Sequence, residues 1–300
     1  MKKFFAATSA LAASALLLAG CASATPTATN TAAAAGVDSK AAALLPASFK
    51  TAGINVGSDI PYAPMEMFDS NNKPIGFDVD LANAIGAKLG VAIKFEKQSF
   101  DSLIPSLQAA KHDVAISSMS DTVERQKVLD FVDYFNGGAS LLVAKGNPNN
   151  ITSLNDLCGK PVAAEAATWE VDLLNTQSDT CKKAGKAALQ VLTLPGDTDA
   201  LNAVHAQKAV AYLADSQVAA YDVKTAGSGK FFDLVIDPAN PNGYESGLIG
   251  VGILKKNSGL RDAIQAAVQS LIDDGTYDKL LSKWNLESFK IDKATVNGTK

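Results

Sequence analysis

Strand-like and helix-like segments alternate between about residues 53 and 117, and this alternation constrains the fold more than any other feature of the sequence. Short apolar runs at 53–59, 91–98 and 113–117 are typical of strands. The segment 77–90 between two of them reads as an amphipathic helix that ends at Gly90, and 99–112 reads as a second helix. Strands that alternate with helices form a mainly parallel sheet covered by helices. The sequence therefore predicts an α/β fold.

A second series of the same kind follows and predicts a second lobe. Its expected strands are 140–146, 161–164, 189–195, 210–215, 232–237 and 246–256, and its expected helices are 168–185, 197–209, 216–226, 260–275 and 276–285. After residue 237 too few strands remain for the C-terminal part to fold alone, so we expect the chain to return to the first lobe. The predicted boundaries are 49–143 plus 240–288 for lobe 1, 146–237 for lobe 2, a two-strand hinge near 143–147 and 236–242, and a loose polar tail over 289–300.

The N-terminus predicts export and a lipid anchor. Residues 1–20 combine two lysines with a short apolar run, too short for a comfortable membrane span, and end in Leu-Ala-Gly before Cys21. This pattern resembles the bacterial lipoprotein box, in which the cysteine is lipidated; the alternative is an ordinary secretory signal with an incidental cysteine. Because no later run of 18 apolar residues occurs, we expect lipid to hold the mature chain at the membrane. Residues 21–48 are rich in Ala and Thr and read as a flexible tether.

The cysteine content agrees with export, and the charge balance excludes one class of partner. The formal net charge is −4, and it becomes −6 when the two lysines within the first 20 residues are removed. This balance argues against nucleic-acid binding, which needs a concentrated basic face. Cys158 and Cys181 remain besides Cys21, and in an oxidising compartment they can form a disulfide; two buried thiols are the alternative.

Polar residues at strand ends mark the candidate site. Asp59, the run Ser117, Ser118 and Ser120, and Asp215 each follow or end a predicted strand. Ligands of open α/β sheets bind outside the carboxyl ends of strands. Each aspartate alone could equally cap a helix or form a turn, but the set occurs at corresponding ends of both halves.

Arg125 adds a cation to this set. The segment 117–131 reads as a polar turn that opens a helix, with Arg125 in the first turn, where the helix dipole disfavours a cation. A guanidinium there is suited to a carboxylate that arrives as ligand. The alternative is a surface arginine paired with Glu124 or Asp121.

Long collinear motifs resemble the amino-acid-type extracellular solute-binding proteins of ABC importers, over about residues 50 to 287. The motifs are SDIPYAPMEMFDSNNKPIGFDVDLANAIG, FDSLIPSLQAAKHDVAISSMSDTVERQKVLDFVDYF, SLNDLCGKPVAA, VAYLADSQVAAY and DGTYDKLLSKW. The resemblance implies the type II periplasmic-binding-protein fold. Two lobes, each a mainly parallel sheet flanked by helices, would close as a clamp on an amino acid at a two-strand hinge.

The resemblance also implies roles for single residues, and it shows departures from the family pattern. By this resemblance, Arg125 and Ser120, with Thr168 from the second lobe, would bind the α-carboxylate of the amino acid. Ser118 and Asp215 would bind its α-ammonium, with Ser117 as a nearby wall of the pocket. Tyr62 and Phe100 would lie on either side of the ligand side chain, and Asp59 and Glu165 would contact its distal end. The chain departs from the family pattern at five positions: Met65 replaces a phenylalanine, Ala167 a glycine, Trp169 a small polar residue, Gln207 a glycine and Val210 an aspartate. The larger Trp169 would fill space or stack on the ligand.

The two acids at the distal end favour a basic or amide side chain, such as that of lysine, arginine, ornithine or glutamine, unless a lysine or arginine of the chain pairs them. The predicted function is capture of a polar or basic amino acid and its delivery to the transmembrane subunits of an ABC transporter. The expected protein is a monomer without metal or cofactor, lipid-anchored on the cell membrane and facing the extracellular space or periplasm. The main alternative is an enzyme, a cyclohexadienyl or arogenate dehydratase-like protein on the same fold. No G-x-S-x-G or H-E-x-x-H motif supports a hydrolase.

Overall fold

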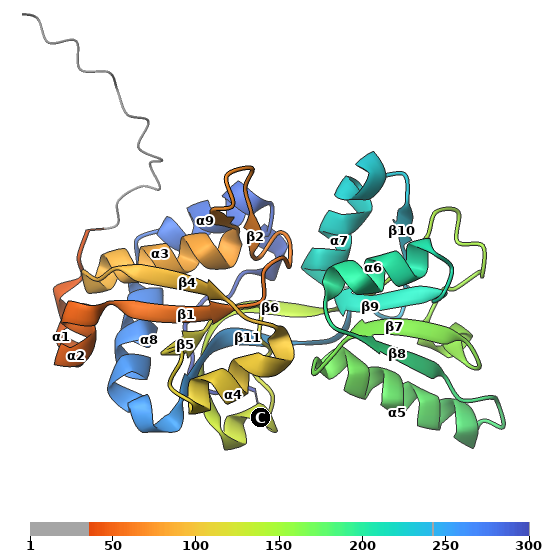
Figure 1. The fold of residues 1–300 in the computed structure, drawn as a ribbon, viewed down its shortest axis with the longest axis horizontal. Helices are drawn as coiled ribbons and strands as arrows, with labels where there is room; N and C mark the ends of the chain where they lie inside the picture. Colours follow the sequence, from red (N-terminus) through yellow and green to blue (C-terminus); the bar gives the residue numbers. More distant parts are fainter. Residues whose placement is uncertain (1–35, 242, 300) are drawn as a thin grey trace, which may run out of the picture. The chain divides into compact units, whose positions relative to one another are not determined.

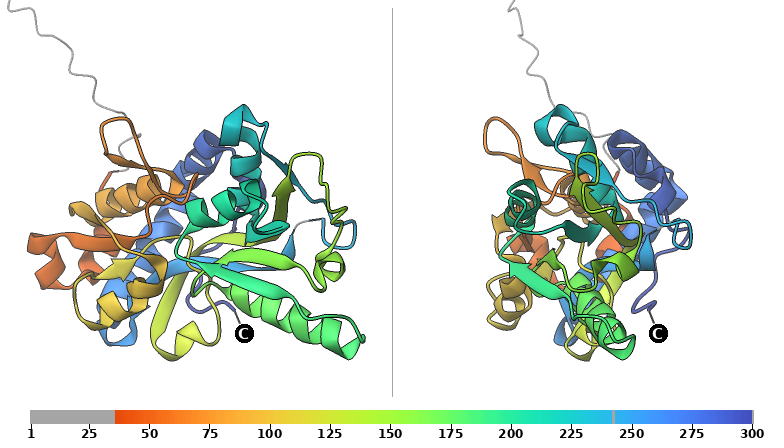
Figure 2. Two further views of the ribbon diagram at one scale, coloured as in Figure 1. Left: turned by 45° about the vertical axis from the view of Figure 1, so that its right-hand side comes forward. Right: turned by 90° about the vertical axis from the view of Figure 1, so that its right-hand side faces the viewer.

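The computed structural model describes residues 36–241 and 243–299, which form two lobes that share one nine-stranded sheet (Figures 1 and 2). The strand order is β4-β1-β5-β11-β6-β9-β7-β8, and β10 pairs with β6. The strands are β1 (Ile54–Ser58), β4 (Ile93–Lys97), β5 (Val114–Ala115), β6 (Leu129–Ala144), β7 (Pro161–Glu165), β8 (Gln190–Leu194), β9 (Ala211–Asp215), β10 (Phe232–Leu234) and β11 (Tyr244–Leu254), with a separate hairpin of β2 (Met67–Phe68) and β3 (Pro74–Ile75).

Helices flank the sheet in both lobes, which confirms the predicted α/β fold class. The α-helices are α1 (Ser39–Leu44), α2 (Ala47–Ala52), α3 (Phe77–Leu89), α4 (Leu103–Gln108), α5 (Trp169–Lys183), α6 (Asp197–His205), α7 (Ser216–Thr225), α8 (Ser258–Asp273) and α9 (Thr276–Trp284). Short 3-10 turns are η1 (Phe100–Ser102), η2 (Arg125–Lys127), η3 (Leu154–Leu157), η4 (Ala226–Ser228), η5 (Lys255–Asn257) and η6 (Glu287–Phe289).

Each lobe has a parallel group of strands and its own apolar core. In the first lobe β1 pairs in parallel with β4 and β5, and α3, α8 and α9 bury side chains such as Phe77 against the sheet. In the second lobe β7 pairs in parallel with β8 and β9. In this lobe, successive residues of β6 point to opposite faces of the sheet: Leu141 packs with Leu174 of α5 on one face, and Leu142 packs with Val204 of α6 on the other.

Two antiparallel strands, β6 and β11, connect the lobes. Along β6, Phe135 belongs to the first core and Ala139 to the second; along β11, Tyr244 belongs to the second core and Ile249 to the first. The residues at which the chain passes from one core to the other are therefore 136–138 and 245–247, whereas the predicted hinge strands were near 143–147 and 236–242. Nearly all of β6 is buried on both faces, so its sequence lacks the two-residue period by which a strand is recognised.

The helix predicted within 117–131, with Arg125 in its first turn, is wrong. Arg125–Lys127 forms a single 3-10 turn, and β6 starts at Leu129. Arg125 therefore does not lie in the first turn of an α-helix, and the helix dipole gives no account of it.

Two segments predicted to be flexible are folded. The tether predicted to reach residue 48 is helical from Ser39: Asp38 caps α1, and Ala41 and Leu45 are buried against the first core. The predicted loose tail is also attached, because Ile291 and Ala294 are buried and Val296 pairs with Val132 of β6. In both cases the few apolar residues of the segment pack against parts of the first lobe that are distant in sequence, and the local composition gives no sign of this packing.

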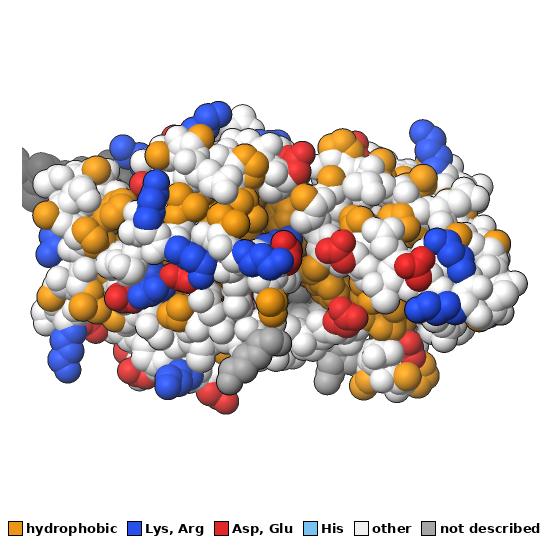
Figure 3. All heavy atoms as spheres, turned by 90° about the horizontal axis from the view of Figure 1, so that it is seen from below, with side chains coloured by type: hydrophobic (Ala, Val, Ile, Leu, Met, Phe, Trp, Pro, Cys, Tyr) orange, Lys and Arg blue, Asp and Glu red, His pale blue; other side chains and the backbone are white. Residues whose placement is uncertain are grey.

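Other sequence expectations fall partly outside the described residues. Cys21 and the signal segment lie outside them, whereas Cys158 and Cys181 are joined by a disulfide with their Cα atoms 5.6 Å apart. No helix among the described residues is long and apolar enough to cross a membrane, and no group of three or more His, Cys, Asp or Glu in that part could hold a metal ion. Figure 3 shows acidic and basic side chains interspersed on one face.

Candidate functional site

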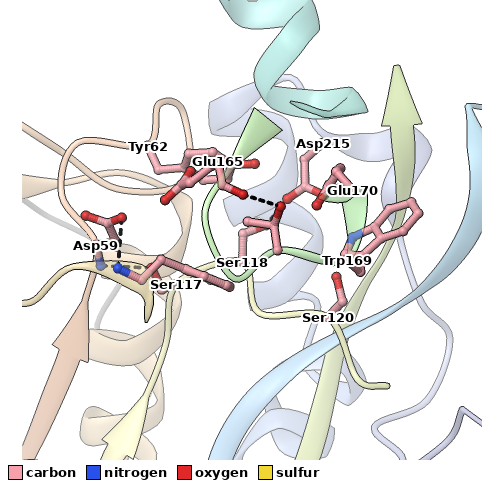
Figure 4. Close-up of a pocket in the computed structure, with 11 residues that line it drawn as sticks. Asp59, Tyr62, Ser117, Ser118, Ser120, Glu165, Trp169, Glu170 and Asp215 are labelled. Carbon is pink, nitrogen blue, oxygen red and sulfur yellow. Dashed lines mark hydrogen bonds between the residues drawn. The ribbon is translucent and has the colours of Figure 1, made fainter. Parts of the chain in front are cut away.

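A narrow cavity between the two lobes, with only about 10 Å³ of free space, gathers the predicted ligand-binding residues, except Arg125 (Figure 4). Its predicted lining residues are Asp59, Tyr62, Phe100, Ser117, Ser118, Ser120, Glu165, Thr168, Trp169 and Asp215. Glu170, which the sequence analysis did not single out, also lines the cavity.

Strand ends place the acidic residues around this cavity. Asp59 directly follows β1, Glu165 is the last residue of β7, and Asp215 is the last residue of β9. The carboxyl ends of parallel strands meet at one edge of a sheet, so each lobe presents its acids toward the other. Glu170 is positioned by a helix and not by a strand end: it lies in the first turn of α5, where the helix dipole favours an acid.

The serine run connects the lobes. Ser118 has a left-handed backbone (φ 45°), and its Oγ donates a hydrogen bond to Asp215 Oδ2 at 2.9 Å. Gln217 Nε2, from α7, donates to the same Oγ at 3.0 Å. Ser117 Oγ accepts from the backbone N–H of Asp59 at 2.8 Å, which ties the end of β1 to the serine run.

Two buried acids of the first lobe hold the serines from beneath. Ser117 Oγ donates to Glu66 at 2.6 Å, and Asp78 Oδ2 accepts from the backbone N–H of Ser118 at 2.8 Å and from Tyr134 Oη at 2.9 Å. Both acids are fully buried. Burial raises the pKa of Asp78 to about 7 and raises the pKa of Glu66 well above its usual value, with the negative charge of Asp78 adding to the latter. The raised pKa of Glu66 favours its protonated form beside Asp78.

A second acid pair joins the lobes at one end of the cavity. Burial, then the hydrogen bond and the repulsion from Asp59, raise the pKa of Glu165 to about 10. Burial also raises the pKa of Asp59, while hydrogen bonds from Glu165 and from the backbone N–H of Phe100 oppose the shift. A neutral Glu165 thus donates to Asp59 across the interlobe cavity.

A third pair lies within the second lobe. Glu170 is 3% exposed, and burial followed by repulsion from Asp215 raises its pKa well above the usual value. Burial likewise raises the pKa of Asp215, opposed by its hydrogen bonds with Ser118, Glu170 and Tyr62 and by the charge of Arg125. The carboxyl groups of the cavity are therefore held close together by shared protons.

Arg125 lies at the edge of this cavity. Its Nη1 donates to Ser120 O at 2.9 Å, its Nη2 donates to Ala167 O of the second lobe at 3.0 Å, and its guanidinium lies 5.3 Å from the centre of the Phe100 ring. Ala167 has φ 64°, a conformation that favours glycine, so this chain keeps the expected backbone at the position where it departs from the family pattern. Burial lowers the pKa of Arg125, and the nearby charges of Glu170 and Asp215 oppose the change.

The site carries an excess of acid over base. Four carboxyl groups line the cavity, those of Asp59, Glu165, Glu170 and Asp215, and among the described residues no lysine or arginine lines it. Arg125, at the edge, supplies one positive charge. A ligand with one negative and two positive groups would complement this arrangement.

Sequence reasoning missed three of the paired acids, Glu66, Asp78 and Glu170. Glu170 follows the predicted contact Trp169 directly, and that proximity was the one available signal. Glu66 and Asp78 gave no local signal, because their hydrogen bonds with Ser117, Ser118 and Tyr134 join residues that lie 40 or more positions apart.

Comparison of the sequence with known proteins identifies its family. The model of the bacterial extracellular solute-binding proteins, family 3, matches residues 54–287. The chain is 30% identical over 259 residues to the arginine-binding protein ArgT of Corynebacterium glutamicum, covering 85% of this chain and 82% of that protein. It is 31% identical over 232 residues to the lysine/arginine/ornithine-binding periplasmic protein of Escherichia coli, covering 77% of this chain and 86% of that protein.

A solved structure shows the same fold. An ancestral arginine-binding protein bound to glutamine superposes with a TM-score of 0.68 at 34% identity, covering 78% of this chain and 98% of that chain. The proteins to which this chain is similar are named as binding proteins. Because the family model covers most of the sequence, the chain belongs to family 3 of the bacterial extracellular solute-binding proteins.

Proposed function

We propose that this protein is a lipid-anchored receptor that captures a basic amino acid outside the membrane and delivers it to an ABC transporter permease. The observation that carries the proposal is the cavity with four carboxyl groups between the lobes and one arginine at its edge. The names of the relatives, which bind arginine, lysine and ornithine, support it.

The α-carboxylate and the α-ammonium of an amino acid need partners of opposite charge. Arg125 has five N–H groups, two of which donate to Ser120 O and Ala167 O, and a bidentate guanidinium is well suited to the carboxylate. Asp215 and Ser118 form the anionic end for the ammonium. Because these groups come from both lobes, full pairing of the ligand requires the lobes to be closed, which makes closure depend on ligand.

The distal end of the cavity selects the side chain. A basic side chain would lie between Tyr62 and Phe100 and end at Asp59 and Glu165, replacing the proton that these acids share. Two buried carboxylates are costly without a cation, so a charged side chain gains more here than a neutral one.

A ligand screen tests the proposal. We expect L-arginine, L-lysine or L-ornithine to raise the melting temperature, since a ligand that binds only the folded state adds RT ln(1 + [L]/Kd) to stability. L-Citrulline, a neutral isostere of L-arginine, is the matched control and should bind at least about tenfold more weakly, about 1.4 kcal/mol. Equal shifts with L-arginine and L-citrulline, or none with any amino acid, would refute the selectivity for a basic side chain.

Arg125→Lys tests the carboxylate contact. Lysine keeps the charge but lacks the planar fork, so we expect a loss of about 2 kcal/mol or more in binding. Binding of L-arginine that is unchanged in this variant would remove Arg125 from the site.

The dehydratase alternative is weaker, because prephenate carries two carboxylates and would meet an acidic cavity. As a binding protein, the chain would not convert its ligand. Incubation with prephenate or arogenate should give no aromatic product by absorbance; formation of product would overturn the assignment as a binding protein.

The anchor and the monomeric state are also parts of the proposal. We expect lipid on Cys21 to carry the protein into the detergent phase on phase partitioning, and Cys21→Ser to move it to the aqueous phase. Light scattering of the detergent-free Cys21→Ser protein should give the mass of one chain.

A further inference from the structure

The segment Ile291–Thr299 lies beyond the family match, which ends at residue 287, yet it is bonded along its length to the first lobe. Asp133 N–H donates to Thr295 O at 3.0 Å, and Asn297 N–H donates to Phe131 O at 3.1 Å, so the segment runs beside the first half of β6. Asn297 Oδ1 in turn accepts from Phe131 N–H at 2.8 Å.

Two buried acids anchor the segment. Asp133, which is fully buried, accepts from Thr295 Oγ1 at 2.5 Å and from Gly298 N–H at 3.0 Å. Asp121, which is 2% exposed, accepts from Thr299 N–H at 3.1 Å. Repulsion from Asp121 adds to the burial that raises the pKa of Asp133 to about 7, so donors from the segment hold two acids that would otherwise repel each other.

The end of the segment reaches the loop that carries the carboxylate contacts. Gln126 Nε2 donates both to Asp121 Oδ1 at 2.7 Å and to Thr299 O at 2.9 Å. Ser120 directly precedes Asp121, and Arg125 directly precedes Gln126. The segment therefore holds both ends of the loop 121–126 through Asp121 and Gln126.

We propose that Ile291–Thr299 is a positioning strap, which orients Ser120 and Arg125 for the α-carboxylate so that ligand affinity depends on a segment outside the family domain. The inference rests on the proposed function for the ligand and on the hydrogen bonds above for the strap. The strap contacts no ligand itself, so its residues act through Arg125 and Ser120.

A pair of substitutions at one position isolates the contact. Thr299→Pro removes the N–H from which Asp121 accepts. Thr299→Ala keeps it and is the matched control, because the hydrogen bonds of Thr299 to Asp121 and Gln126 use only its backbone N–H and C=O. A second variant ends the chain after Asn297 and removes Gly298, Thr299 and Lys300 together, while it keeps the buried Ile291 and Ala294.

Hydrogen exchange of the ligand-free full chain is the first readout. We expect amides of 121–127 to exchange faster in Thr299→Pro and in the shortened chain, and to exchange as in wild type in Thr299→Ala. This readout does not depend on the identity of the ligand. Unchanged exchange in both altered chains would overturn the strap even if the protein binds a basic amino acid.

Calorimetric titration is the second readout, with L-arginine and L-argininamide as probes. We expect Thr299→Pro and the shortened chain to bind L-arginine about tenfold more weakly, with little change for L-argininamide, which lacks the carboxylate. A segment that only stabilises the lobe would lower the melting temperature and leave both dissociation constants unchanged, which would refute positioning. Failure of wild type to bind L-arginine would count against the proposed function, while the exchange of 121–127 would still decide the strap.

Discussion

Replacing Glu165 by glutamine should stabilise the ligand-free protein, and the gain should grow with pH. Glu165 is 4% exposed and its pKa is raised to about 10, whereas in the unfolded chain it titrates near 4.5. Between these values the folded protein binds more protons than the unfolded chain, so wild type loses stability as the pH rises. A glutamine carboxamide mimics the protonated carboxyl and does not titrate.

The raised pKa sets the size of the effect. At 1.36 kcal/mol per pH unit, keeping Glu165 protonated costs the wild type about 3 kcal/mol at pH 7 but only about 1 kcal/mol at pH 5. Glu165→Gln should recover much of this cost, which for a chain of this size corresponds to a rise in melting temperature of about 6–12 °C at pH 7. The same substitution should weaken binding of L-arginine, because one of the two distal carboxyl groups is lost.

Denaturant unfolding of the ligand-free protein at pH 5 and pH 8 measures the effect. Glu124→Gln is the control, because the Glu124 side chain is 79% exposed and its ion pair with Lys127 should contribute less than about 1 kcal/mol. A loss of stability in Glu165→Gln, or a gain of equal size at both pH values, would refute the inference that Glu165 is held neutral against Asp59.

Three further outcomes follow from the acid pairs and the disulfide. Glu66→Gln should also stabilise the ligand-free protein more at pH 8 than at pH 5, since a carboxamide can donate to Asp78 without titrating; urea unfolding with the opposite pH trend would contradict the shared proton. Binding of L-arginine should release protons and strengthen from pH 5 to pH 8, and titrations in buffers of different ionisation enthalpy that give equal heats would count against this. Replacing Cys158 and Cys181 by serine should cost about 3 kcal/mol of unfolding free energy, and an unchanged denaturation midpoint would show that the bridge adds nothing.

The strand ends of the site could be predicted from sequence because a parallel sheet brings its carboxyl ends together. Asp59, Ser118 and Asp215 were singled out on that ground, and the structure brings them to one cavity. Arg125 was singled out for a reason that fails, since no α-helix begins there, although the family resemblance placed the same residue at the ligand carboxylate.

Pairing between distant residues could not be predicted. Glu66 and Asp78 share a proton beneath the serines, and Glu170 shares one with Asp215, but nothing within a few residues of them signals a partner. The segment Ile291–Thr299 was expected to be loose because it is polar. Its polar groups instead bind Asp121 and Asp133, which lie more than 150 residues earlier.

A crystal structure of the protein with bound L-arginine tests the central claim most directly. We predict that the α-carboxylate of the ligand lies about 3 Å from the guanidinium of Arg125, that its α-ammonium meets Asp215, and that its own guanidinium ends between Asp59 and Glu165. A complex in which Arg125 still bonds only to Ser120 O and Ala167 O, with the ligand elsewhere, would contradict the account.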